Sequence, residues 1–110
     1  MKSTKKDNCL ILEDEKNNAK DFADFISTLL KKFENENLVI DLLKYGKLTL
    51  EELLNFLKPS IEHYKNGKSF VIVNDTIIID DVPEELRVVP TLQEAKDLIQ
   101  MEEIERDLDF

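Results

Sequence analysis

NLVIDLLKYGKLTLEELLNF, residues 37–56, joins an apolar run that ends on an aspartate to a capped amphipathic helix. A similar couplet recurs near the C-terminus, where LRVV runs into PTLQEAKDLI. Apolar runs without polar alternation are typical of parallel strands that are covered on both faces. Strands that alternate with helices indicate an α/β fold. We therefore predict a layer of mostly parallel strands with helices packed against it.

The length and the charge limit the functions that this chain can have. Its 110 residues predict a single domain over 1–110, with a core of about 9–101 and an acidic C-terminal tail, 102–110. The net charge of −9 repels phosphate backbones, so nucleic-acid binding would need a local basic patch. Lysines cluster at 2–6 and 31–32 without interleaved aromatics, and we expect them to solvate the terminus and a helix end.

Cysteine content and hydropathy bear on the compartment. Cys9 is the single cysteine, so no intramolecular disulfide can form, and we expect a buried, inert thiol. The N-terminus does not have the pattern of a signal peptide, and no apolar run approaches the roughly 20 residues that span a bilayer. These observations predict a cytoplasmic protein that does not enter a membrane.

Apolar spacing and capping residues locate three helices. The first is predicted to begin after Asn17 or Asn18 and to end at Phe33. The second covers 49–64, begins with a T-x-x-E capping box and contains Pro59, which should kink or break it. The third begins with another capping box and should bury Leu92, Ala95, Leu98, Ile99 and Ile104.

Four strands separate these helices. They are predicted at Cys9–Leu12, Leu38–Leu42, Phe70–Val73 and Leu86–Val89. Residues 74–81 are compatible with either a hairpin or an extended edge segment. The tail could extend the last helix through Ile104, Leu108 and Phe110, either as a solvated end or as a partner-docking segment.

Three segments carry a resemblance to a known family. They are LVIDLLKYGKLTLEELLNFL, KSFVIVN and LRVVPTLQEAKDLI. The order of a strand ending in Asp41-Leu42, a capped helix, a strand preceded by Gly67, and a closing strand and helix is similar to a diverged STAS domain. That family includes the bacterial anti-sigma factor antagonists. The resemblance implies a non-enzymatic regulatory module, without a cofactor, that binds a regulatory protein such as a kinase-type anti-sigma factor.

The chain departs from the STAS pattern at the position that regulates these antagonists. The family is switched by phosphorylation of a serine at the start of the helix after Asp-Leu, but Thr49 provides the hydroxyl here. Glu51 could imitate a permanent phosphate or could simply favour the helix dipole. The region after Val73 is also shorter than the family usually has. We predict partner binding through Tyr45, Lys47, Thr49, Glu51 and Glu52.

A catalytic function and a ligand-binding function are the alternatives to this interaction module. The chain is similar to short bacterial chains that carry a ribonuclease Z label, yet a two-zinc nuclease needs several histidines and His63 is the single one. We expect His63 to be a partly exposed structural residue. The competing hypothesis is an acidic pocket at the strand ends, formed by Asp14, Asp41 and Asp80, that binds a metal ion such as Mg²⁺ or a small ligand.

Overall fold

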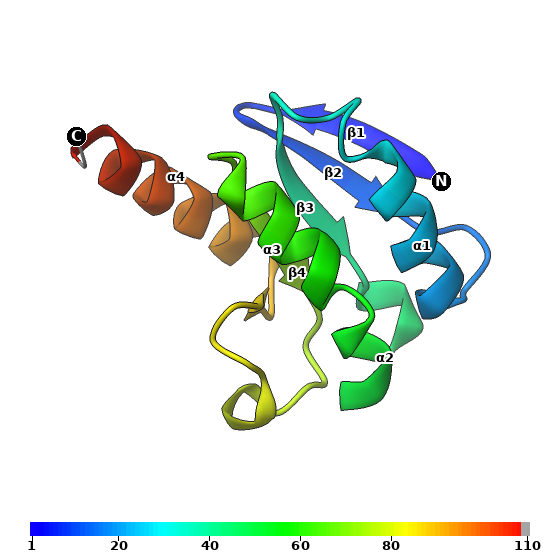
Figure 1. Cartoon of the computed structure of the whole chain (residues 1–110). Helices are drawn as coiled ribbons and strands as arrows, with labels where there is room; N and C mark the ends of the chain where they lie inside the picture. The colour runs from blue at the N-terminus through cyan, green and yellow to red at the C-terminus, as the bar shows by residue number, and fades with distance from the viewer. Residues whose placement is uncertain (109–110) are drawn as a thin grey trace.

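The computed structural model describes residues 1–108 and consists of one five-stranded sheet with helices on both faces (Figure 1). The strands lie side by side in chain order, β1-β2-β3-β4-β5. Strands β2 to β5 are mutually parallel, and β1 pairs with β2 in the antiparallel direction. The strands are β1 (Lys2–Lys6), β2 (Cys9–Glu13), β3 (Asn37–Asp41), β4 (Phe70–Val73) and β5 (Arg87–Val89). The predicted α/β fold with a mostly parallel sheet is confirmed.

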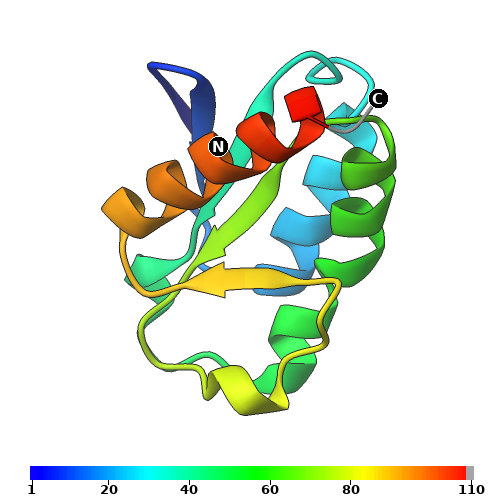
Figure 2. The same cartoon turned by 90° about the vertical axis from the view of Figure 1, so that its left-hand side faces the viewer.

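The helices divide between the two faces of the sheet. They are α1 (Ala19–Leu29), α2 (Leu50–Leu54), α3 (Leu57–Lys65) and α4 (Leu92–Leu108), with short 3-10 turns η1 (Leu43–Tyr45) and η2 (Ile79–Asp81). Helices α1, α2 and α3 lie on one face, and α4 crosses the other (Figures 1 and 2). None of the helices described, from α1 to α4, combines the length and the apolarity of a membrane-spanning segment.

Alternating residues of the central strands supply the two cores. Leu38, Ile40 and Ile72 face the core shared with α1 and α2, where Phe22 packs edge-on against Phe56 at a centroid distance of 6.1 Å. The intervening residues Val39, Val71 and Val73 pack against Ala95 and Ile99 of α4. Both faces of β3 and β4 are therefore buried, which explains their uninterrupted apolar sequences.

Strand β1 was not predicted: Lys2, Lys5 and Lys6 are exposed to solvent as expected, but the segment that carries them is a strand of the sheet. Its five residues pair in register with all five residues of β2, from Lys2 opposite Glu13 to Lys6 opposite Cys9. Lys5 also forms an ion pair with Glu36. Lysines on an edge strand disfavour pairing with other chains, so the same residues that complete the sheet also protect its edge.

Helix boundaries differ from the prediction in two places. Asn18 caps α1 by accepting a hydrogen bond from the backbone N–H of Asp21 at 3.1 Å, as expected, but the helix ends at Leu29 rather than at Phe33. The second predicted helix is divided into α2 and α3 before Pro59, not at it. Pro59 lies in the first turn of α3, where backbone N–H groups have no partner within the helix and proline is tolerated.

The segment between β4 and β5 is neither a hairpin nor an extended strand. Bends lead into η2, and the Asn74 side chain closes the loop by donating to the carbonyls of Leu42, at 3.2 Å, and Gly46, at 3.1 Å. Its amide oxygen accepts from the backbone N–H of Thr76 at 2.9 Å. This segment is therefore tied to the loop that follows β3.

Helix α4 includes most of the acidic tail. Thr91 accepts a hydrogen bond from the backbone N–H of Glu94 at 3.1 Å, and the helix then continues to Leu108. The predicted position of Phe110 lies outside the described residues. Ala95 and Ile99 are buried as predicted, but Ile104 is 54% exposed and Glu102 is 5% exposed. The prediction that Ile104 packs inward is wrong, because an acidic residue occupies the inner face at this level.

Candidate functional site

The predicted interaction surface lies beyond the carboxyl ends of the parallel strands, around the start of α2 (Figure 1). Lys47, Thr49, Glu51 and Glu52 are all exposed there. Among residues 1–108, the recorded ion pairs involve none of these four residues. The structure therefore groups four of the five predicted residues on one exposed turn. We refer to these four residues as the α2 surface.

Thr49 and Glu52 form the capping box that the sequence predicts. The Thr49 hydroxyl accepts from the backbone N–H of Glu52 at 3.1 Å and donates to the Glu52 carboxylate at 3.0 Å. That carboxylate also accepts from the backbone N–H of Thr49 at 3.1 Å. Because the hydroxyl has a donor role and an acceptor role within the cap, its first function is to hold the helix start. Glu51 makes no such contact in the described chain, so its charge is free at the helix N-terminus.

The loop before α2 is held by the segment after β4. The Thr76 hydroxyl accepts from the backbone N–H of Leu48 at 3.1 Å and donates to the Gly46 carbonyl at 3.0 Å. Gly46 itself has φ of 63°, a conformation that favours glycine. Leu48 is buried in the core beside these contacts. The α2 surface is therefore presented by an anchored loop, which limits the entropy cost of binding a partner.

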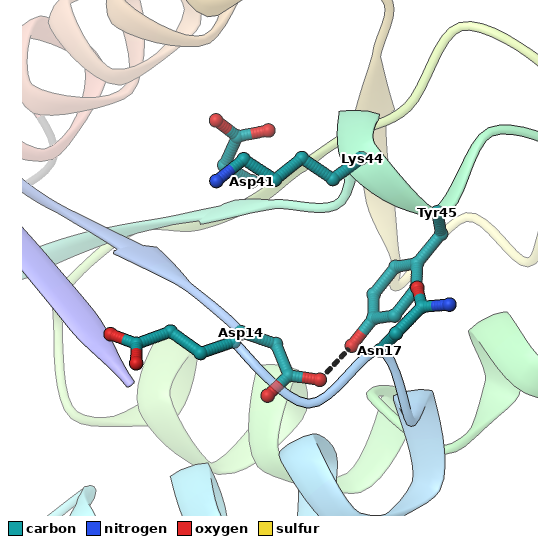
Figure 3. A pocket seen from close by; sticks show the side chains of 6 residues that line it. Asp14, Asn17, Asp41, Lys44 and Tyr45 are labelled. Atoms are coloured by element: carbon teal, nitrogen blue, oxygen red, sulfur yellow. Dashed lines mark hydrogen bonds between the residues drawn. The ribbon is translucent and has the colours of Figure 1, made fainter.

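Tyr45 does not belong to this surface. Its ring is half-buried and points toward Asp14, to which its hydroxyl donates a hydrogen bond (Figure 3). Burial and the neighbouring Asp14 carboxylate raise the pKa of Tyr45 well above its usual value, so the hydroxyl stays protonated. The structure thus separates Tyr45 from the other four predicted partner-binding residues.

Tyr45 instead lines a cavity of about 360 Å³ at the carboxyl ends of β2 and β3. Its lining residues are Asp14, Glu15, Asn17, Asp41, Lys44 and Tyr45 (Figure 3). The structure therefore brings together Asp14 and Asp41, two members of the predicted acidic pocket. The third predicted member, Asp80, does not line the cavity, because residues 74–81 fold over the loop before α2 instead.

Two of the three carboxylates that line the cavity, those of Asp14 and Asp41, already have backbone partners. Asp14 accepts from the N–H groups of Lys16 and Asn18, each at 3.0 Å, and Asp41 accepts from the N–H of Leu43 at 3.0 Å. Burial favours a raised pKa for Asp14, but hydrogen bonds from Tyr45 and the backbone outweigh it and lower that pKa. Burial raises the pKa of Asp41. Within residues 1–108, no group of three or more histidine, cysteine or acidic side chains is arranged to hold a metal ion.

His63 and Cys9 are both structural. His63 is 2% exposed rather than partly exposed, and its Nε2 lies 2.7 Å from the carbonyl oxygen of Glu36. Its ring packs edge-on against Phe70, and burial lowers its pKa. Cys9 is fully buried, as predicted, and burial raises the pKa of its thiol. Burial therefore disfavours the imidazolium form of His63 and the thiolate form of Cys9.

A buried polar cluster was missed by the sequence analysis. Ser69 and Arg87 both donate to the Glu102 carboxylate, at 2.7 and 2.6 Å, and Arg106 donates to the Ser69 hydroxyl at 3.2 Å. The Arg87 guanidinium also lies 3.6 Å from the centroid of the Tyr64 ring. We call Ser69, Arg87, Glu102 and Arg106 the polar cluster. The sequence contains a pattern that could have revealed this cluster. Glu102 and Arg106 continue the helical spacing of Ala95 and Ile99, so they lie on the same inner face of α4.

Comparisons with known proteins do not assign this chain to a family. No protein-family model matches it, and a search of curated proteins finds no match either. The similarity to STAS domains therefore remains a prediction from the segments around Asp41-Leu42, Gly67 and Thr91. The function must be inferred from the geometry of the α2 surface and of the cavity.

Proposed function

We propose that this protein is a non-enzymatic interaction module of STAS type that binds a regulatory protein through Lys47, Thr49, Glu51 and Glu52. The observation that carries the proposal is the exposed, capped N-terminus of α2, whose charged side chains have no ion-pair partner within residues 1–108. Charged groups on an anchored turn are suited to fixing the register and orientation of a partner.

The order of elements around this turn supports the STAS assignment. Strand β3 ends at Asp41, directly before Leu42, the capped helix α2 follows after η1, Gly67 precedes β4, and β5 leads into the closing helix α4. This is the sequence of elements on which the resemblance rests. A kinase-type anti-sigma factor is the partner class that the resemblance favours.

The charge at Glu51 supports binding without a phosphorylation switch. Negative charge at a helix N-terminus is stabilised by the helix dipole, whether it comes from a carboxylate or a phosphate. The Thr49 hydroxyl is engaged with Glu52 on both its donor and acceptor sides. Phosphorylating it would remove its donor hydrogen and place a second negative group beside the Glu52 carboxylate. We propose that Glu51 gives the surface its binding charge permanently.

Site-specific crosslinking tests this proposal. A photoreactive amino acid replaces Leu54, an exposed residue of α2 outside the four proposed contact residues, in the full chain expressed in the source cells, and captured proteins are identified by mass spectrometry. The expected result is enrichment of one regulatory protein, with capture reduced about tenfold by Glu51→Arg because the charge at the surface is reversed. Asp21→Arg is the matched control, since Asp21 is also an exposed acid in the first turn of a helix, α1. Capture that is equal in both variants, or that does not exceed background, refutes the proposal.

The second candidate function is binding of a small polar ligand in the cavity beside Tyr45. Its support is the position of the cavity at the carboxyl ends of two parallel strands, where α/β folds commonly bind ligands. Lys44 lies at its rim and forms an ion pair with Glu13 at 3.3 Å, so the lining offers both signs of charge. Calorimetry with Mg²⁺ and Ca²⁺ tests the metal version of this candidate. A heat of binding that is lost in Asp41→Asn would favour it over the interaction module.

A further inference from the structure

The C-terminal half of α4 has its apolar and polar sides reversed relative to an ordinary surface helix. Met101, Ile104 and Leu108 are 55%, 54% and 72% exposed, although their spacing places them along one side of the helix. Glu102, in contrast, is 5% exposed. A helix that packed only for the stability of its own domain would bury its apolar stripe. We call Met101, Ile104 and Leu108 the α4 stripe.

The polar cluster holds α4 in this orientation. Glu102 is bonded to Ser69 of the loop before β4 and to Arg87 of β5. The neighbouring Glu103 accepts from the Asn37 side chain at 3.1 Å. Turning the α4 stripe inward would break these contacts and leave buried charges without partners, which is strongly unfavourable. The stripe is therefore presented outward by a fixed helix.

Acidic side chains border the α4 stripe. Asp97, Glu105 and Asp107 are exposed on the same helix, and the recorded ion pairs of residues 1–108 include none of them. A second copy of the chain would bring like charges together across the contact. Anionic lipids and nucleic acids are repelled for the same reason. The charges instead match a partner that carries lysine or arginine beside its apolar residues.

We propose that the α4 stripe is a docking site for a basic amphipathic helix of another protein. The apolar side of that helix would pack along Met101, Ile104 and Leu108, and its basic residues would reach the acidic side chains at the borders. Helices commonly recognise partners through apolar residues at such spacings. The stripe lies on the opposite face of the sheet from α2, so this site is separate from the α2 surface (Figures 1 and 2).

A defined peptide pair tests the proposal with the full chain. The probe is a synthetic amphipathic helix of leucine and lysine, and the control peptide has the same pattern with glutamate in place of lysine. Binding is followed by fluorescence anisotropy and by backbone amide shifts. We expect saturable binding of the lysine peptide, weakened by salt, with the largest shifts between residues 97 and 108.

Substitutions distinguish apolar docking from simple charge attraction. Ile104→Asp adds a negative charge, so pure attraction would strengthen binding, whereas docking on the stripe should weaken it about tenfold. Ile78→Asp is the matched control, because Ile78 is 66% exposed and lies outside α4. Circular dichroism confirms that both variants remain folded.

Four outcomes would overturn the proposal. They are equal binding of the glutamate peptide, unchanged or tighter binding by Ile104→Asp, cosedimentation with phosphatidylserine vesicles through the stripe, and self-association that Ile104→Asp abolishes. The first two would show that the stripe does not select a basic helix. The last two would assign it to a membrane surface or to a second copy of the chain.

Discussion

Removing the Glu102 carboxylate is expected to destabilise the protein by about 2–3 kcal/mol. Glu102→Ala leaves the Ser69 hydroxyl and the Arg87 guanidinium without their shared acceptor. Deleting one partner of a fully buried ion pair costs about 3–5 kcal/mol. The cost should be lower here because the Arg87 side chain is 26% exposed, and because it keeps its contacts with the Tyr64 ring and the Glu85 carbonyl.

Urea and thermal unfolding measure this loss. For a domain of this size, about 2–3 kcal/mol corresponds to a fall in melting temperature on the order of 10 °C. Glu105→Ala is the matched control on the same helix, and as an exposed acid it should change stability by less than about 0.5 kcal/mol.

A double-mutant cycle identifies the source of the effect. If the ion pair carries the loss, Glu102→Leu combined with Arg87→Met should cost much less than the sum of the two single variants, because neither charge of this pair is left without the other. A Glu102→Ala cost below about 1 kcal/mol, or additive single effects, would refute the claim that this pair holds α4.

Three further predictions concern local features. Burial lowers the pKa of His63 in the folded state, so as the pH falls the unfolded chain protonates this ring before the folded chain does. The free energy of unfolding should therefore keep its full value above about pH 6.5 and decrease below that pH, by at most about 1.4 kcal/mol per pH unit. Urea unfolding between about pH 7 and pH 5.5 measures this slope, which should disappear in His63→Asn; an unchanged slope contradicts the assignment. Thr49→Ala should cost about 1 kcal/mol through loss of the cap, and Thr49→Ser should restore most of it; equal stability of the two variants would argue against the capping role. Gly67→Ala should destabilise the protein by about 1–2 kcal/mol, because Gly67 has φ of 84°, a backbone conformation that alanine disfavours. No atom lies within 4 Å of an added Cβ, so this cost would be purely conformational. An unchanged melting temperature would contradict it.

Local sequence patterns were sufficient for the helices that bury an apolar stripe. Asn18 and Thr49 cap helices where the sequence predicts, because a side-chain oxygen satisfies a backbone N–H within three residues. The parallel strands were recognisable because burial on both faces demands continuous apolar runs. These features depend on neighbours in the chain, which a sequence displays directly.

Part of the candidate site was also predictable. The α2 surface follows from a capping box and the charged residues beside it. The position of Tyr45 did not follow, because its direction is set by Asp14, which lies 31 residues earlier in the chain. Of the three residues predicted to form the acidic pocket, Asp14 and Asp41 line the cavity and Asp80 does not. Asn74 and Thr76 bind the loop after β4 to Gly46, which the sequence does not display.

The sequence by itself determined the α/β class, the central parallel strands and the capped start of α2, because each depends on local propensity or on apolar periodicity. Only the tertiary structure decided that the basic segment at 2–6 completes the sheet, since an edge strand draws its stability from hydrogen bonds to β2 rather than from buried side chains. Only it decided which side of α4 faces inward. Partners from β5 and the loop before β4 make Glu102 stable in the interior, and the apolar residues of the α4 stripe are consequently left outside.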